Sequence, residues 1–218
     1  AGAFSVKGWE FMQAAFKKIP QFFGGERWVL GDRTYESIDP AKIEPELQAR
    51  YRNDFIGQWR KFLAQSEVAP YRGVADAAQK LQQLSSNQSF LLALFCVATV
   101  NTNVPSEEAK LPYKPVHFVE PPGCPDRYVQ GSNSGYVSAL VNLQTAMDRV
   151  AKAGADLKDD LVSQTLNEAT SAYRVTRQIA QNFRIDREGN VHGMVQKLME
   201  DPIKHAEGIL GRLGPAQL

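Results

Sequence analysis

The sequence predicts an all-α protein, a helical bundle of about seven or eight helices with a long proline-rich crossover loop. Three observations support this fold class. Apolar residues recur every three or four positions over most of the chain, as they do on one face of a helix. Capping residues, prolines and glycines divide these stretches into separate segments. The regular alternation of polar and apolar residues that indicates strands is missing.

Two helices are expected in the first third of the chain. Ser5 is a suitable N-cap for a helix that Pro20 and the Gly24–Gly25 pair would end. The apolar face of this helix consists of Trp9, Met12, Phe16 and Ile19. A second helix is expected after Asp39–Pro40, where aspartate is the cap and proline lies in the first turn. Its long apolar stripe consists of Ile43, Leu47, Tyr51, Phe55, Trp59 and Phe62.

A third and a fourth helix follow before the middle of the chain. Apolar spacing predicts a short helix over residues 74–84, and the polar stretch LSSNQS ends it. The fourth helix, from Phe90 to Val100, is apolar nearly all round. We therefore expect it to be the central helix, wrapped by the others.

Residues 102–133 interrupt the helical pattern. They contain six prolines, namely Pro105, Pro112, Pro115, Pro121, Pro122 and Pro125. A segment of this length without helical spacing is expected to be a functional loop or a packed crossover. The chain is thus divided into a helical part over 1–101, a connecting segment over 102–133 and a second helical part over 134–218. The two helical parts are expected to form one compact unit.

Helical spacing resumes after the connecting segment. Two long helices are predicted over 136–150 and 162–183, followed by a turn at IDREGN. A short helix is expected over 194–198. Asp201–Pro202 is expected to open a separate last helix, because aspartate before proline is typical of a helix start.

Composition excludes several classes of protein. The chain has 218 residues, with 25 Lys and Arg against 24 Asp and Glu. This balance argues against a dedicated nucleic-acid-binding protein, which would carry a basic excess. The longest apolar run, Phe90–Val100, is shorter than the roughly 18 residues that cross a bilayer. The first residue is Ala1, which suggests a piece of a longer protein.

The two cysteines leave the redox state open. Cys96 lies within the apolar run, where a free thiol behaves as a small hydrophobic side chain. Cys124 lies in the loop EPPGCPD. Free thiols are the favoured interpretation, and a bridge between the two cysteines in an oxidising compartment stays open as the alternative.

The stretch GGERWVLGDRT, residues 24–34, has the glycines of a phosphate-binding loop but not its spacing. Five residues separate Gly25 from Gly31, where the nucleotide-binding motif has four, and Asp32 stands where the motif has lysine. A negative charge would then face the phosphate. The stretch is therefore predicted to be a structural turn that carries Trp28, Val29 and Leu30 into a core.

Motifs for catalysis, metals and cofactors are missing from the sequence. The histidines, His117, His192 and His205, do not pair at metal-ligand spacing. The stretch DREGN over 186–190 lacks the oxygen ligands of a calcium loop and predicts a turn. Asp54 is expected to form a helical ion pair with Arg50. No cofactor, metal or small-molecule substrate is expected.

Two neighbouring stretches resemble the IcmF/TssM family of bacterial type VI secretion systems. The stretch YRNDFIGQWRKFL, from Tyr51 to Leu63, resembles the Tyr-x-x-Asp-aromatic-x-x-x-Trp-x-x-Phe-Leu pattern of that family. GERWVLGD, from Gly25 to Asp32, is similar to a turn that precedes the pattern. The family-motif residues are Gly25, Glu26, Trp28, Leu30, Gly31, Tyr51, Asp54, Phe55, Trp59 and Phe62. FSVKGWEFM, NSGYVSALVNLQTAM and LMEDPIKHAEGILG also resemble family segments, in order, whereas Ser89–Phe90–Leu91 departs from an expected Ser-Pro-Leu.

The resemblance implies a scaffold and not an enzyme. The chain would be a helical segment of the periplasmic region of a protein anchored in the inner membrane, without the family's nucleotide-binding region, membrane spans and β-rich C-terminal part. Its partners would be copies of itself, other subunits of the secretion membrane complex and an outer-membrane lipoprotein. The connecting segment 102–133 and the exposed faces of the later helices are the candidate contact surfaces.

Two other interpretations stay open at this point. A generic helical adaptor of an unrelated cytoplasmic system would be equally inert but would carry reduced cysteines. An enzyme acting on cell-wall material around Asp54 and Tyr51 would need a carboxylate in a cleft with a perturbed pKa and a second polar group within reach.

Overall fold

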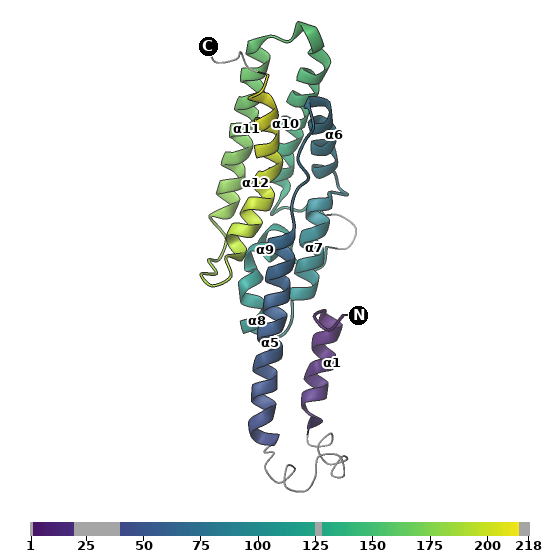
Figure 1. Ribbon diagram of the computed structural model, residues 1–218, viewed down its shortest axis with the longest axis vertical. Coiled ribbons are helices and arrows are strands. Elements are labelled where there is room, and N and C mark those ends of the chain that lie inside the picture. Colours follow the sequence, from purple (N-terminus) through teal and green to yellow (C-terminus); the bar gives the residue numbers. More distant parts are fainter. Residues whose placement is uncertain (1, 20–39, 125–127, 214–218) are drawn as a thin grey trace.

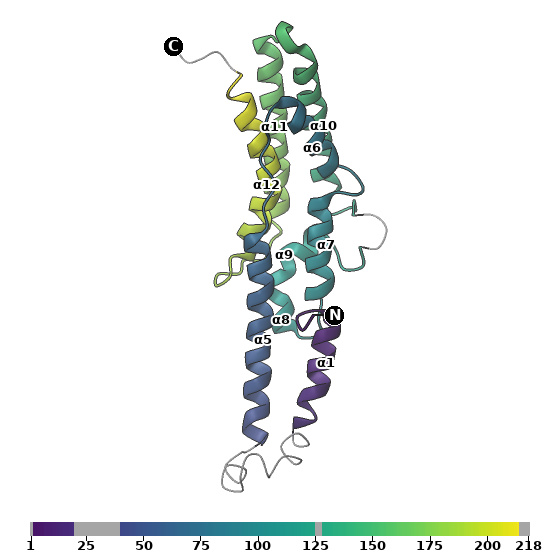
Figure 2. The ribbon, with the colours of Figure 1, turned by 45° about the vertical axis from the view of Figure 1, so that its right-hand side comes forward.

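The computed structural model describes residues 2–19, 40–124 and 128–213. Within these ranges the chain forms α-helices and short 3-10 helices and no strand, which confirms the predicted all-α class. The helices form an elongated bundle (Figure 1). A long helical hairpin makes one end of the bundle, and the first helix lies beside a long second helix near the other end (Figure 2).

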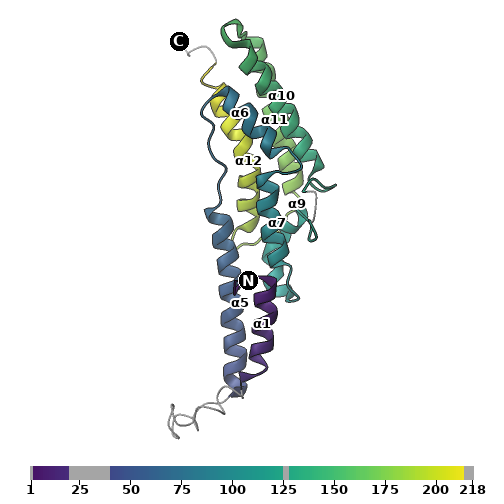
Figure 3. The ribbon, with the colours of Figure 1, turned by 90° about the vertical axis from the view of Figure 1, so that its right-hand side faces the viewer.

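Four helices pack side by side in the half of the bundle that contains the hairpin. They are α6 (Val74–Leu84), α10 (Ser134–Ala153), α11 (Asp159–Ala180) and α12 (Val191–Leu210). Helix α10 packs against α6 and α11, and α11 packs against α12 (Figure 3). Their shared core continues into the other half, where the remaining long helices are α1 (Val6–Phe16), α5 (Pro40–Gln65) and α7 (Phe90–Thr102).

The buried apolar residues form two clusters. The larger one joins α6, α7, α10, α11 and α12, and its largest fully buried side chains include Tyr113, Tyr136, Phe95 and Met199. The smaller cluster is mostly aromatic and joins α1 to α5 through Trp9, Phe16, Tyr51 and Phe55. Trp59 is partly buried against both clusters, so α5 connects the two cores.

Much of the connecting segment 102–133 is helical, which differs from the irregular crossover expected from its prolines. It contains α8 (Glu107–Lys110), the 3-10 helix η1 (Leu111–Tyr113) and α9 (Lys114–Val119). Ser106 caps α8 by accepting a hydrogen bond from the Ala109 N–H at 3.3 Å. Pro112 and Pro115 occupy first-turn positions of η1 and α9. Proline is favoured there because its missing N–H has no helical partner in any case.

Helix α7 is not the central helix, so this expectation was wrong. One face of it is buried, but Phe90 is 71% exposed, Val97 49% and Val100 44%. A helix that is apolar on all of its faces need not be buried on all of them, because the neighbouring helices cover only the faces that they can reach. The result is an apolar stripe on the surface of α7.

The predicted break at Asp201–Pro202 was also wrong. Helix α12 runs without interruption through Pro202, which is buried inside it. Proline there removes one backbone hydrogen bond and disfavours a helix. The buried apolar side chains of α12 on both sides of Pro202, among them Leu198, Ile203 and Ala206, keep the helix packed against its neighbours.

Candidate functional site

The motif residues of α5 form the centre of the aromatic cluster. Phe55 is fully buried, and the ring of Trp9 on α1 meets it edge-on with 4.9 Å between the centroids. Tyr51 lies one turn earlier and contacts Trp9 and Phe16, with centroid distances of 5.4 and 5.9 Å. The spacing of four residues places both rings on the face that α1 covers. The core-packing role predicted for these aromatic residues agrees with this arrangement.

Polar atoms of the same motif hold the segment that leads into α1. The Tyr51 hydroxyl donates a hydrogen bond to the carbonyl oxygen of Ala3 at 2.6 Å. The Trp59 indole N–H donates to the carbonyl oxygen of Phe4 at 2.8 Å. Trp59 also packs edge-on against Phe62, with 5.3 Å between centroids. The motif on α5 therefore fixes both the side chains and the backbone of the N-terminal segment.

Asp54 lies outside this cluster. Its side chain is exposed on α5, and among the described residues it makes no ion pair with Arg50, so the expected helical pair is not formed. The hydroxyl of Tyr51, the other residue named in the enzyme interpretation, donates its hydrogen bond to the Ala3 carbonyl oxygen. This geometry gives no support to a catalytic role for Asp54.

The other half of the family motif cannot be placed. Gly25, Glu26, Trp28, Leu30 and Gly31 lie in the range 20–39, outside the described residues. The prediction of a structural turn there stays a prediction.

A half-buried ion pair joins α5 to the turn before α12. A guanidinium nitrogen of Arg60, Nη2, lies 3.0 Å from Oδ1 and 2.9 Å from Oδ2 of Asp186. Asp186 Oδ1 also accepts from the Gly189 N–H at 3.2 Å, which stabilises the turn. Asn190, at the end of this turn, has a left-handed backbone with φ of 51°. DREGN is thus a structural turn whose aspartate is already paired.

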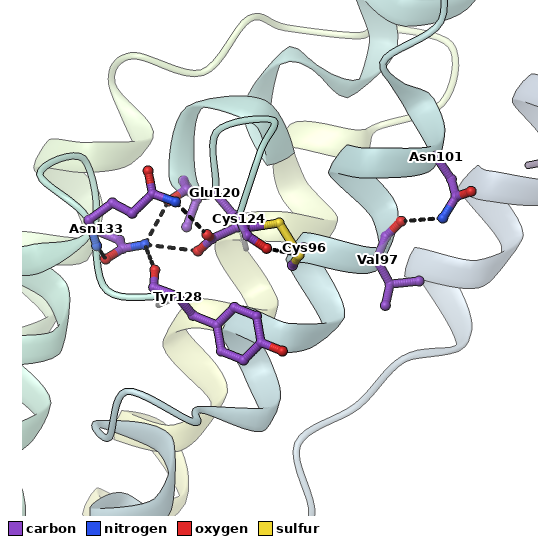
Figure 4. Close-up of a disulfide and its surroundings, with 9 residues drawn as sticks. Cys96, Val97, Asn101, Glu120, Cys124, Tyr128 and Asn133 are labelled. Carbon is purple, nitrogen blue, oxygen red and sulfur yellow. Dashed lines mark hydrogen bonds between the residues drawn. A yellow bond between two sulfur atoms is a disulfide. The ribbon is translucent and has the colours of Figure 1, made fainter. Parts of the chain in front are cut away.

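A disulfide joins Cys96 on α7 to Cys124 in the segment after α9 (Figure 4). The favoured interpretation of free thiols was therefore wrong, and the alternative of a bridge is the observed state. Two cysteines 28 residues apart carry no sequence signal for pairing, since the bridge requires the α7–α9 packing to bring them together. Cys124 is buried beside the end of α9.

A buried acidic residue lies next to the disulfide. Glu120 is fully buried at the end of α9, where Oε1 accepts from Gln130 Nε2 and Oε2 from Asn133 Nδ2, both at 3.0 Å (Figure 4). The Asn133 amide group also lies 2.9 Å from the carbonyl oxygens of Val119 and Tyr128. We call Glu120, Gln130 and Asn133 the Glu120 cap, since they connect the end of α9 to the start of α10.

Burial controls the protonation of this cap. It raises the pKa of Glu120 to about 7, against the lowering effect of the hydrogen bonds from Gln130 and Asn133. The cap was not found from the sequence. Glu120 and Asn133 come together only in the fold, since they are separated by the loop between α9 and α10.

An apolar hollow of about 260 Å³ lies between the segment after α5 and the start of α7. Its walls include Val68, Leu84, Phe90 and Leu94. The ammonium group of Lys80 at this hollow donates to Asp76 Oδ2 at 2.8 Å and to the Pro70 carbonyl at 2.9 Å, so it is already paired. The hollow therefore offers apolar surface and not reactive groups.

The described parts of the chain contain neither a metal-binding cluster nor a membrane-spanning helix. There, no group of three or more His, Cys, Asp or Glu side chains is arranged to hold a metal ion. None of the helices in those parts has the length and hydropathy needed to span a membrane.

The relationship to known proteins rests on the first half of the chain. Residues 1–103 match the sequence model of the family described as "IcmF-related: Intracellular multiplication and human macrophage-killing". Neither a curated protein nor a solved structure matches the chain. The matched region contains α1, α5 and the whole motif from Tyr51 to Leu63. The match indicates a component of a type VI-like secretion system. It confirms the resemblance found in the sequence, since residues 1–103 match the model of the IcmF-related family.

Proposed function

We propose that this chain is a non-enzymatic scaffold, a periplasmic segment of the envelope-spanning membrane complex of a bacterial type VI secretion system. It acts through protein–protein contacts with other subunits of that complex, including an outer-membrane lipoprotein, and with copies of itself in the full-length protein. The family match supports the secretion system, and the disulfide supports the compartment.

The Cys96–Cys124 disulfide is the observation that carries this proposal. Disulfides form and persist in the bacterial periplasm, whereas cytosolic thiol systems keep cysteines reduced. A cytoplasmic adaptor, the competing interpretation, would hold both cysteines as thiols. The disulfide therefore favours the periplasmic scaffold over the adaptor.

The use of the motif residues supports a structural role. The ring of Phe55 packs against α1, and polar atoms of Tyr51 and Trp59 donate hydrogen bonds to the backbone of the segment before it. The half-buried Arg60–Asp186 pair likewise holds two parts of the fold together. These groups contribute rigidity, which suits a component that positions its neighbours.

The contact surfaces follow from exposure. Helix α8, the exposed Phe118 of α9 and the outer faces of α10 to α12 are the surfaces that we propose for partner contacts, as expected for the connecting segment and the later helices. Exposed acidic side chains of α8, Glu107 and Glu108, carry ion pairs to lysines of the same segment and to Arg52 of α5.

The thiol state in cells tests the proposal. Cells that produce the full-length parent protein are quenched in acid, and free thiols are blocked with a maleimide. The sample is then reduced and labelled with a second, heavier maleimide, and the peptides that contain Cys96 and Cys124 are weighed by mass spectrometry.

We expect both peptides to carry the second label only, because their thiols appear only after reduction. A Cys96→Ser variant is the matched control, in which Cys124 should carry the first label. Uptake of the first label by both cysteines of the wild type would mean a reducing compartment and would favour the adaptor.

Partner contact is tested separately by co-purification. The full-length protein with and without residues 1–218 is used to capture the other membrane-complex subunits of the same secretion cluster. Capture that is lost with the deletion supports contacts made by this segment. Full capture by the shortened protein would mean that these helices act only as a spacer.

A further inference from the structure

Two different fastenings, one covalent and one made of hydrogen bonds, stabilise the junction between α9 and α10. The disulfide ties Cys124 to α7, and the Glu120 cap ties the end of α9 to the start of α10 (Figure 4). Glu120 and Cys124 are only four residues apart, so movement of one displaces the other. The two fastenings are therefore expected to be coupled.

The cap alone is a costly arrangement. Glu120 is fully buried, and its hydrogen-bond partners among the described residues are the neutral amides of Gln130 and Asn133. A carboxylate that is held by neutral donors is better solvated by water than by a protein interior. The cap therefore has a driving force to open, and a constraint on the same segment is needed to oppose it.

The disulfide supplies that constraint. Cys124 is buried and held to α7, which limits how far the chain after Glu120 can move toward solvent. Asn133 needs the end of α9 in place, since its amide group bonds to the Val119 carbonyl as well as to Glu120. Loss of the constraint would separate Val119 and Glu120 from Asn133 together.

We propose that the Cys96–Cys124 disulfide is a redox latch for the Glu120 cap, so that its reduction opens the α9–α10 junction. A thiol reductant supplies two electrons and two protons; the S–S bond breaks, two cysteine thiols form, and the reductant becomes a disulfide. The junction then closes fully only after oxidation. The latch deepens the proposed function. It rests on that function only for the oxidising compartment.

Thermodynamic linkage makes the latch testable from both sides. If the disulfide favours the closed cap, then the closed cap must stabilise the disulfide against reduction by the same factor at equilibrium. Opening the cap by mutation should therefore expose the disulfide to reductant without any change at the cysteines.

The first experiment measures amide hydrogen exchange of the folded 218-residue chain, oxidised and then reduced with dithiothreitol. The Cys96→Ser/Cys124→Ser double variant is measured alongside. We expect peptides over 116–124 and 128–137 to exchange at least about tenfold faster after reduction, which corresponds to about 1.4 kcal/mol. Peptides from α11 should be unchanged. Equal exchange in both states, or the same acceleration throughout the chain, would overturn the latch.

The second experiment measures the rate at which dithiothreitol reduces the disulfide, followed by alkylation and mass spectrometry. Asn133→Ala removes the centre of the cap, and Asn142→Ala on the exposed face of α10 is the matched control. Gln130→Ala, which deletes only the bond to Glu120 Oε1, serves if Asn133→Ala does not fold.

We expect the disulfide of the cap variants to be reduced several-fold faster than that of the wild type. The disulfide of Asn142→Ala should be reduced at the wild-type rate. Equal rates for the wild type and a folded cap variant would refute the coupling. This result would leave the thiol state in cells untouched, so the latch and the proposed function can fail independently.

Discussion

The Arg60–Asp186 pair connects α5, within the family-matched region, to the turn before α12, outside it. We predict that Arg60→Gln and Asp186→Asn each destabilise the protein and that their effects are not additive. The side chains are 24% and 12% exposed, and Nη2 of Arg60 contacts both carboxylate oxygens. The exposure of this pair is thus intermediate between that of a surface ion pair and that of a buried one.

The magnitude follows from that position. Exposed ion pairs contribute about 0–1 kcal/mol, and hydrogen bonds to charged groups contribute about 1.5–3 kcal/mol. We expect each single substitution to cost about 1.5–2 kcal/mol and the pair to show a coupling energy of about 1 kcal/mol. Each single loss corresponds to a fall in Tm of about 3–8 °C for a chain of this length.

Urea denaturation followed by circular dichroism at pH 7 provides the assay. Wild type, both single variants and the double variant form a double-mutant cycle. The exposed Lys152–Asp148 pair on α10 is the matched control, and Lys152→Gln should cost less than about 0.5 kcal/mol. Strict additivity at Arg60 and Asp186, or single losses as small as that of the control, would refute the structural role of the pair.

Three further predictions concern the motif, the cap and the extent of the folding unit. Tyr51→Phe and Trp59→Phe each remove one hydrogen bond to the segment before α1, which is worth about 1 kcal/mol. Both variants should speed amide exchange over residues 2–16 but not in α11. Unchanged protection of residues 2–16 would contradict this role. Burial raises the pKa of Glu120 from 4.5 to about 7, so the folded state holds its proton longer than the unfolded state, and stability should fall by at most about 3 kcal/mol as pH rises through this window. Glu120→Gln should lack this decline, and parallel stability curves for the two proteins would rule out the buried carboxyl as its source. A fragment of residues 1–103 should be largely unfolded by circular dichroism, whereas a cooperative urea transition of that fragment would show that it has a sufficient core of its own.

The helices with one apolar face were predictable from sequence because their spacing alone determines which residues face the core. Tyr51, Phe55 and Trp59 lie on the expected face of α5, and the periodicities of α10 and α11 correspond to observed helices. Local spacing was less informative where proline occurs. Pro112 and Pro115 lie in the first turns of short helices, whereas Pro202 lies within the long helix α12, so the same residue type has two different local contexts.

Features that depend on long-range packing could not be derived from the sequence. The stripe on α7 is exposed because the neighbouring helices do not reach Phe90 and Val97, which composition cannot reveal. Cys96 meets Cys124, and Glu120 meets Asn133, only after α7, α9 and α10 have packed together. The candidate site depends mainly on these contacts, whereas the family motif was visible in the sequence at once.

The limits of the family match and of the fold do not coincide. The match ends at residue 103, yet the aromatic cluster around Phe55 includes Val104 and Ala109, which lie beyond that limit. Ile56 accepts a hydrogen bond at 2.5 Å from the hydroxyl of Tyr113, and Arg60 pairs with Asp186. A free N-terminal region would lose each of these contacts and expose the apolar side of α5 and α7. We therefore infer that residues 104–213 complete the core of the family region, and that the motif on α5 is rigid because the later helices hold its opposite face.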